Sequence, residues 1–447
     1  MSLKSFSKNF ISILLTVGVI FSCCSCDVKK SDKDPTPSET VSSMVEDIRF
    51  DSDHNVEVLL DNVCTITKYE PDYSSLICYN DFLKETFSGT VVTRAQWLKL
   101  LLEKLNIEKS EHDPSNYTLV SDRNYYSDSE YFITAIENGI LYHGWTEFDN
   151  NAPITKQFVS TSFSRAMEYN INCVLYCNDY YDIDEKIEAA TMVYLGYFEL
   201  DENYWFNPEE VIEKEKADYL LSEIDVYKAL ENKTVLSFGD SIMHGEGNDY
   251  VGIAELISLK YNTNAIDYSK GGATFGVATG REQISNQILR AIQNNEQADV
   301  ILINGGTNDM RHVPFGAIAD KDDFAYGEHG RKQFCQGMEY ALGLLKDNYP
   351  DTPLLYIRAH DMMFSLERNE LHYGKTALDI CKKWNVPVAD IFNDTDFYAH
   401  DEDIRYEYTY HSRRCPYGDS VHPNRDGYYK YYVPLVVTEL LELTTND

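Results

Sequence analysis

Basic residues are scarce in this chain of 447 residues. Lys and Arg together number 39 against 73 for Asp and Glu, which gives a formal net charge of -34 at pH 7. A surface this acidic repels phosphate backbones, so nucleic acid is excluded as an expected partner. The apolar fraction of 43%, with 13% aromatics, still suffices to build hydrophobic cores, and a chain of this length is expected to divide into two domains.

The apolar run near the N-terminus is too short to span a membrane. FISILLTVGVIF, residues 10–21, follows two lysines and has the length of a secretory signal. Residues 20–23, Ile-Phe-Ser-Cys, resemble the lipobox of bacterial lipoproteins, which implies a lipid anchor on Cys23. An ordinary cleaved signal, or lipidation of one of the next two cysteines, is the alternative. We expect a signal segment over 1–26, a flexible tether over 27–45, and an extracytoplasmic protein anchored to the bacterial cell membrane.

Cysteines and histidines at metal-ligand spacing are missing as well. Of the ten cysteines, three lie in the signal segment and seven are scattered beyond it. An odd number at irregular spacing is not a disulfide framework, although export would permit one or two bridges. Cys173 and Cys177 have no second pair and no histidine at ligand spacing, so we expect buried thiols and no metal site.

Residues 46–228 indicate helices in repeated units. Two segments, 130–167 and 186–221, each read as a helix, a glycine stop, a loop with Phe and Pro, and a second helix. In both, 15 positions separate the glycine from the apolar residue that leads into the second helix. A less regular copy ends at residues 91–107. Because such units need neighbours to bury their apolar sides, we expect a mainly α-helical repeat domain.

These units resemble S-layer homology repeats, the helical modules by which many bacterial surface proteins hold cell-wall polysaccharide. The resemblance rests on VTRAQ at 92–96, on ITK at 154–156 and on the spacing of Gly, Phe and Pro. In that family the Thr-Arg segment at a helix start contributes to the polymer site, which carries over to Arg94 and Lys156. The third unit departs from the pattern with VIEK at 211–214. A spacer domain without a ligand, in which the threonine only caps its helix, is the alternative.

From residue 229 to 447 the pattern changes to strands that alternate with helices. Short apolar runs of this kind are typical of strands buried on both faces of a parallel sheet. The alternation predicts a doubly wound α/β domain, in which sites form at the carboxyl ends of the strands. The expected strands are TVLSFGD (234–240), NAIDYS (264–269), ADVILINGG (298–306), PLLYIRA (353–359) and VPVADIF (386–392).

Polar residues and glycines follow three of these strands. Ser241 comes after the first strand, Gly272 after the second and Asn308 after the third. Near the C-terminus, Asp419 and His422 lie just before the last expected helix. Each of these residues alone is ordinary in a turn. Their joint order within one domain predicts a shared site at one edge of the sheet.

These blocks resemble those of the SGNH hydrolases, also called the GDSL esterase and lipase family. The matching blocks are GDS at 239–241, GGAT at 271–274, GTND at 306–309 and DSVH at 419–422. They cover about the last half of the chain. The resemblance implies a flavodoxin-like three-layer domain with a parallel sheet, here preceded by the helical repeats. It also implies a serine ester hydrolase, for which we expect no cofactor.

The chemistry of these residue types agrees with the resemblance. A serine hydroxyl is a poor nucleophile at neutral pH and needs a base, a role that suits the imidazole of His422. Asp419, three residues earlier, can hold the other ring nitrogen in the right tautomer. Attack by Ser241 on an ester creates an oxyanion. The N–H groups of Ser241 and Gly272 and the side-chain amide of Asn308 could stabilise it.

Three other polar residues near these blocks have simpler explanations. His244 has no obvious carboxylate partner in the sequence, and we expect it to line the site. His360 follows the fourth strand, where it either shapes the substrate pocket or is a hydrogen-bonded structural histidine. Asp309 is expected to support its own loop by hydrogen bonding.

We expect hydrolysis of an O-acyl ester, with acetyl as the leading candidate, on a carbohydrate or cell-wall polymer. A lipase or phospholipid acylhydrolase is the alternative among enzymes, and it would show a broad apolar groove around Ser241. A deacetylase would instead show a shallow, polar cleft edged by aromatic residues. A wall-binding surface protein with an idle hydrolase domain is the alternative from another class, and the complete set of site residues argues against it.

Overall fold

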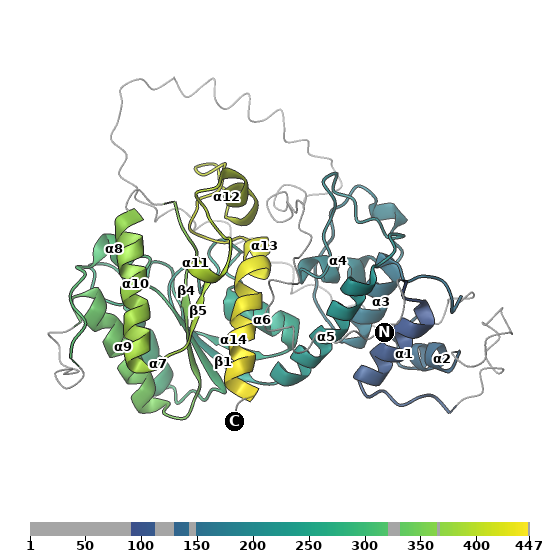
Figure 1. The fold of residues 1–447 in the computed structure, drawn as a ribbon, viewed down its shortest axis with the longest axis horizontal. Helices are drawn as coiled ribbons and strands as arrows, with labels where there is room; N and C mark the ends of the chain where they lie inside the picture. The colour runs from purple at the N-terminus through teal and green to yellow at the C-terminus, as the bar shows by residue number, and fades with distance from the viewer. Residues whose placement is uncertain (1–90, 112–128, 143–148, 321–330, 364–366, 446–447) are drawn as a thin grey trace, which may run out of the picture. The chain divides into compact units, whose positions relative to one another are not determined.

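The computed structural model describes residues 91–111, 129–142, 149–320, 331–363 and 367–445 (Figure 1). The expected signal segment with Cys23, and the tether over 27–45, lie outside these residues. The five cysteines inside them are free thiols. In the same part of the chain, no helix is both long and apolar enough to cross a membrane.

The predicted glycine stops end two of the helices that precede the sheet. Gly139 follows α2 and Gly196 follows α4, and both have φ of +71°, the left-handed conformation that favours glycine at a helix end. The described helices of this region are α1 (Arg94–Lys104), α2 (Ser129–Glu137), α3 (Lys156–Ala166), α4 (Lys186–Tyr194) and α5 (Lys214–Leu230), with a 3₁₀ turn at Tyr180–Asp182.

Three short extended segments, one from each predicted unit, tie this helical region together. Thr93 caps α1 in a capping box with Gln96, and Thr155 caps α3, as expected of threonine at a helix start. Each segment pairs with the other two and so closes a ring, through the antiparallel bridges Val91–Glu213, Thr93–Pro153 and Thr155–Val211.

The five predicted strands form one parallel sheet in the order β2-β1-β3-β4-β5. Parallel pairing brings their carboxyl ends to the same edge, and the chain reverses direction across the sheet between β2 and β3, with β1 between them. The strands are β1 (Thr234–Phe238), β2 (Asn264–Asp267), β3 (Val300–Asn304), β4 (Leu354–Arg358) and β5 (Val388–Asp390).

Helices cover both faces of the sheet, which gives the expected three layers (Figure 1). Alternate strand residues serve the two cores: Leu236 packs with one set of helices and Val235 with the other. One set consists of α7 (Ile284–Gln293), α9 (Phe334–Asn348) and α10 (Glu367–Trp384), and the other of α6 (Ile253–Tyr261) and α14 (Val433–Thr445).

Short helical segments connect the strands to the long helices at the site edge. A π-helical segment, Tyr428–Tyr432, leads directly into the final helix α14. It lies close to Pro434, which cannot donate a backbone hydrogen bond. The other short elements are α8 (Asp309–His312), α11 (Ile391–Asp394), α12 (Glu402–Tyr408) and α13 (Arg425–Gly427).

Candidate active site

The loop after β1 carries Ser241 and is held from both faces of the sheet. Gly239 leaves no room for a larger residue, because a Cβ there would lie 2.7 Å from the Cβ of Met243. The buried side chain of Gln287, on α7, donates to the carbonyl of Gly239 and accepts from its N–H, both at 2.9 Å. On the other face, the Tyr428 hydroxyl donates at 2.6 Å to the carbonyl one residue after the serine. These contacts fix the backbone that presents Ser241.

A second loop, just before α13, brings Asp419 and His422 to this serine. One oxygen of Asp419 accepts from the backbone N–H groups of Val421 at 3.0 Å and of His422 at 2.9 Å. The other oxygen lies 2.5 Å from His422 Nδ1. His422 Nε2 in turn lies 2.9 Å from Ser241 Oγ, across 181 positions of sequence. The structure therefore joins the three predicted residues in one hydrogen-bonded series.

The surroundings of His422 favour a positive charge on its ring. Burial lowers the pKa of His422, but the hydrogen bond and charge of Asp419, with two further carboxylates, outweigh it and raise the pKa above 6.5. These carboxylates belong to the buried Asp240 and to Glu246, whose Oε2 lies 3.8 Å from His422 Nε2. With Nδ1–H donated to Asp419, the lone pair of Nε2 faces Ser241. The series can therefore move a proton from hydroxyl to imidazole.

A second histidine, His360, lies fully buried behind the Asp–His loop. Its Nδ1 lies 2.8 Å from the Tyr432 hydroxyl, its Nε2 3.3 Å from the carbonyl of Ser420, and its ring stacks on Phe397 with 4.0 Å between centroids. Burial lowers the pKa of His360 to about 3, so the ring is neutral. Because a carbonyl only accepts, Nε2 carries the hydrogen and Nδ1 accepts from the tyrosine. His360 therefore supports the Asp–His loop as a hydrogen-bonded histidine, and it also lines the cavity at this edge of the sheet, so both expectations are met.

The loops after β2 and β3 bring Gly272 and Asn308 to the same edge of the sheet. Within the described residues, the N–H groups of Ser241 and Gly272 donate to no protein acceptor. Asn308 Nδ2 donates to the carbonyl of Ala273 at 3.1 Å and, at 3.5 Å, to Asp240 Oδ2, so its amide lies between the loops. Two N–H groups and a side-chain amide at one edge are the kind of donors that an oxyanion requires.

Two buried carboxylates connect these loops. Asp309 accepts from the backbone N–H groups of residues 275 and 276, both at 2.9 Å, so it ties the loop after β3 to the loop after β2 and not only to itself. Burial raises the pKa of Asp309 to about 7 and that of Asp240 to about 6. Asp240 accepts from the N–H of Ile242 at 3.0 Å, which keeps the turn at the serine tight.

His244 has a carboxylate partner in the structure, so the expectation that it lacks one is wrong. His244 Nδ1 lies 3.2 Å from Asp267 Oδ2, and this hydrogen bond raises the pKa of His244. Asp267 also accepts from the hydroxyls of Ser237 and Ser269, each at 2.6 Å. Asp267 ends β2, the neighbour of β1, so the pairing becomes visible only once the strand order is known.

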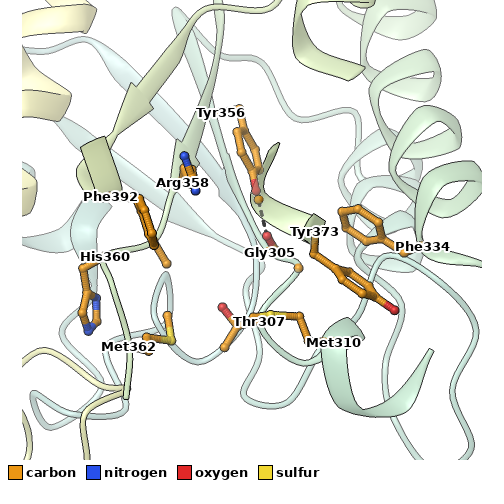
Figure 2. Close-up of a pocket in the computed structure, with 13 residues that line it drawn as sticks. Gly305, Thr307, Met310, Phe334, Tyr356, Arg358, His360, Met362, Tyr373 and Phe392 are labelled. Carbon is orange, nitrogen blue, oxygen red and sulfur yellow. Dashed lines mark hydrogen bonds between the residues drawn. The ribbon is translucent and has the colours of Figure 1, made fainter. Parts of the chain in front are cut away.

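A cavity of about 30 Å³ lies at the carboxyl ends of β3 and β4 (Figure 2). Thr307 and Met310 line it next to Asn308, and His360 lines it from the loop after β4. Its polar walls are already engaged: the Tyr356 hydroxyl donates to the carbonyl of Gly305 at 2.9 Å, and the guanidinium of Arg358 pairs with a carboxylate of β5 at 3.1 Å. The space that remains suits a small apolar group.

The structure buries Lys156 and leaves Arg94 partly exposed. Lys156 Nζ donates to the carbonyl of Glu199 at 2.8 Å and lies 3.4 Å from a carboxylate oxygen of Glu210. Burial lowers the pKa of Lys156, and also that of Arg94, whose guanidinium lies 5.1 Å from the centre of the Phe158 ring. Lys156 is thus held by protein groups within the helical region, and Arg94 is partly buried.

Residues 237–430 match the model of the GDSL-like Lipase/Acylhydrolase family. No curated protein matches the chain. Among solved structures, a protein from Lactobacillus plantarum is 20% identical, with a TM-score of 0.39, over 48% of this chain and 98% of its own. A psychrotrophic esterase from Pseudoalteromonas sp. is 18% identical, with a TM-score of 0.31, over 48% and 98%. An active-site mutant of a family two carbohydrate esterase from Clostridium thermocellum is 16% identical, with a TM-score of 0.33, over 48% and 64%.

The matched residues include every loop described above. Ser241 lies near the start of the match and His422 near its end, and the segment between them contains the whole parallel sheet beyond the first strand. This part of the chain is therefore similar to GDSL-like lipases and acylhydrolases, and the match supports a carboxylic ester hydrolase.

Proposed function

We propose that the protein is an extracytoplasmic serine esterase that removes short O-acyl groups, acetyl foremost, from a carbohydrate or cell-wall polymer. One observation carries the proposal: the hydrogen-bonded series from Asp419 through His422 to Ser241, beside two backbone N–H groups that have no protein acceptor in the described chain. A nucleophile, its base and an anion site are the parts that acyl transfer needs.

Acylation of Ser241 is the first step. Ser241 Oγ attacks the ester carbonyl carbon while its proton passes to His422 Nε2, and Asp419 stabilises the imidazolium through Nδ1–H. The carbonyl oxygen becomes an oxyanion, which accepts from the N–H groups of Ser241 and Gly272 and from the amide of Asn308. When the C–O bond to the alcohol breaks, His422 returns the proton to the departing oxygen.

Hydrolysis of the acyl-enzyme repeats these roles with water. His422 takes a proton from the water molecule as its oxygen attacks the acyl carbon, and then gives that proton to Ser241 Oγ as the ester bond to the enzyme breaks. The products are a carboxylic acid and the free alcohol, and both residues return to their starting protonation states.

The rim of the site supports a polar acyl acceptor. Exposed tyrosines occur on both loops, Tyr250 on the serine loop and Tyr410 and Tyr417 around the Asp–His loop. Burial raises the pKa of Tyr410, and the charges of Asp419 and Asp249 raise it further, so acidic groups lie near this ring. Aromatic faces stack on sugar rings, whereas carboxylates repel the phosphate of a phospholipid. A rim of exposed tyrosines and carboxylates favours a carbohydrate over a lipid.

The cavity beside Asn308 supports a short acyl chain. A single water needs roughly 10–15 Å³ of such space. The cavity of about 30 Å³ therefore has room for two or three groups of that size, which suits a short acyl group. If the acyl group points toward Thr307 and Met310, acetyl fits and a fatty acyl chain does not.

The proposal also includes a location at the cell surface and attachment to the cell wall. A lipid anchor on Cys23 would hold the enzyme at the cell surface, and the ring of repeat units would hold wall polysaccharide near it. Because Lys156 is engaged within the helical region, Arg94 is the residue to test. We expect Arg94→Ala to be retained less than the parent chain in a pull-down with purified wall polysaccharide; equal retention would favour a spacer domain.

The esterase proposal is tested with p-nitrophenyl esters of increasing chain length. The mature chain should hydrolyse the acetyl ester fastest and long-chain esters poorly, and it should release acetate from an acetylated polysaccharide. Ser241→Ala should lose at least about 1000-fold in kcat, because removing the nucleophile leaves only binding and the oxyanion donors. Ser258→Ala, which removes a hydroxyl on α6 that donates to the carbonyl of Thr263 just beyond this helix, is a matched control.

Two results would contradict the proposal. Full activity of Ser241→Ala would overturn the assignment of the nucleophile. Preference for long-chain esters and for phospholipid vesicles, with no acetate released from polysaccharide, would favour a lipase.

A further inference from the structure

Arg281 contacts both loops that carry the proposed oxyanion donors. It lies between the glycine loop and α7, and its Nη1 donates to the carbonyl of Gly272 at 2.9 Å and to Asn308 Oδ1 at 3.4 Å. Its Nη2 lies 2.7 Å from Nε2 of His312, the last residue of the short helix α8 that follows Asn308. One guanidinium thus contacts both Gly272 and Asn308, which lie 36 positions apart in the sequence.

The contact with Gly272 is close enough to define the backbone there. Gly272 has φ of +75°, and a Cβ on it would lie 2.7 Å from Arg281 Nη1. The guanidinium therefore occupies the space that a side chain would take. By holding the carbonyl of Gly272, it keeps this residue in the left-handed conformation in which the N–H remains without a protein acceptor.

The contact with Asn308 sets the direction of its amide. A guanidinium can only donate, so the amide oxygen must face Arg281 and the NH₂ group must face away from it. That orientation directs Nδ2 toward Ala273 and Asp240, between the loops. The opposite orientation would place the NH₂ group against Arg281 and leave the site without its third donor.

The charge of Arg281 also suits this position. Asp419, Asp240 and Glu246 surround His422, and their negative charges oppose the formation of an oxyanion nearby. Within the described residues, Arg281 forms no ion pair, so its charge is not neutralised by a carboxylate there. His312 accepts from Arg281 as a neutral imidazole, because burial and the charges of two arginines lower its pKa.

We infer that Arg281 is a positioning residue of the oxyanion site, which fixes Gly272 and Asn308 as donors and supplies positive charge behind them. The inference rests on the proposed function. It predicts that Arg281 contributes to the transition state and not to binding of the ester in its ground state.

The test compares Arg281→Met and Arg281→Lys with the parent chain on p-nitrophenyl acetate. Arg281→Met should lose about 10- to 100-fold in kcat, somewhat less than removal of a direct donor, with KM changed by less than about threefold. Arg281→Lys keeps the charge but not the forked geometry, so its kcat should lie between those of Arg281→Met and the parent chain. Arg290→Met, which removes an exposed arginine of α7 paired with Glu282, should keep the parent kcat.

A second readout separates positioning from general loss of structure. A trifluoromethyl ketone adds to Ser241 as a hemiketal whose oxygen is an oxyanion. Its affinity should fall by the same factor as kcat/KM in each Arg281 variant, while the melting temperature shows that the variant is folded. If Arg281→Met does not fold, Arg281→Lys carries the test.

Parent-like kcat in the Arg281 variants, or a loss of kcat with unchanged ketone affinity, would overturn the inference. Ser241→Ala distinguishes this failure from failure of the proposed function. If Ser241→Ala is inactive while Arg281→Met is fully active, only the role of Arg281 is wrong. If both are active, the nucleophile is wrong as well.

Discussion

At the scale of single residues, the protonation of His422 controls the proposed reaction. The ring must be neutral to accept the serine proton, and its pKa is raised above 6.5 by Asp419, Glu246 and Asp240 despite the opposing effect of burial. Activity should therefore rise with pH through a midpoint above 6.5 and fall as the pH drops below it. Replacing Asp419 would remove the hydrogen bond that fixes the tautomer of His422, whereas replacing Glu246 leaves that hydrogen bond in place.

Glu246→Gln should move this acid limb to lower pH. Removing a negative charge 3.8 Å from Nε2 makes the imidazolium less stable, so the pKa of His422 falls, by roughly a few tenths of a unit for a partly exposed pair. The measurement is kcat/KM for p-nitrophenyl acetate across about pH 5 to 9, with the exposed Glu231→Gln as control. An unmoved or higher midpoint in Glu246→Gln would contradict this account of the site's electrostatics.

The residues of the site could be predicted to different extents. Ser241, Gly272, Asn308, Asp419 and His422 could be named because each follows a strand or precedes a helix within a recognisable block, and the structure brings these positions together at one edge of the sheet. Arg281 gives no such signal, because an arginine near a helix start is ordinary in sequence. Its contacts depend on how two loops, far apart along the chain, pass each other in space.

At the scale of elements, the strands are the most predictable part of the fold. Their apolar runs are buried on both faces, and the helices between them have clear periodicity, so the sequence predicts all five strands and their helices. The apolar runs do not indicate the order of the strands in the sheet. For this reason the sequence does not reveal the partner of His244: Asp267 ends a strand that only the order places beside β1. The π-helical segment in the last helix is not predicted either.

His360 connects the end of β4 with the Asp–His loop, and a substitution can test this contact. His360→Phe keeps the stacking on Phe397 but leaves the carbonyl of Ser420 and the hydroxyl of Tyr432 without this partner in a buried place. We expect a loss of about 1–3 kcal/mol in the free energy of unfolding, because the buried carbonyl of Ser420 loses this donor, whereas the Tyr432 hydroxyl still accepts from the backbone N–H at position 360. We also expect a lower kcat, because Ser420 lies between Asp419 and His422.

Urea unfolding and kcat, measured on the same preparations, check this expectation. His372→Phe, an exposed histidine of α10, is the matched control and should leave both quantities unchanged. Reduced stability with parent-like kcat would show that His360 supports the core alone and does not position the loop.

At the scale of the whole molecule, α5 belongs to two hydrophobic cores. Its residues up to Ile224 pack with the helical region, whereas Val226 and Leu230 pack with α6 and the sheet. Between these two parts, the fully buried carboxylate of Glu223 accepts from the Tyr261 hydroxyl at 3.0 Å and lies 3.1 Å from Lys260 Nζ. The two predicted domains are thus joined through one continuous helix and a buried ion pair.

This arrangement predicts that the two parts unfold together. Glu223→Gln leaves the ammonium of Lys260 buried without its partner charge, which should reduce the free energy of unfolding by about 3–5 kcal/mol. Calorimetry should then show a single transition in the parent chain, shifted as a whole to lower temperature in Glu223→Gln and unmoved in the exposed Glu231→Gln. Two separate transitions, of which only one responds to the substitution, would mean that the esterase part is stable without its helical neighbour. In that case the role of α5 would be that of a linker between independent domains.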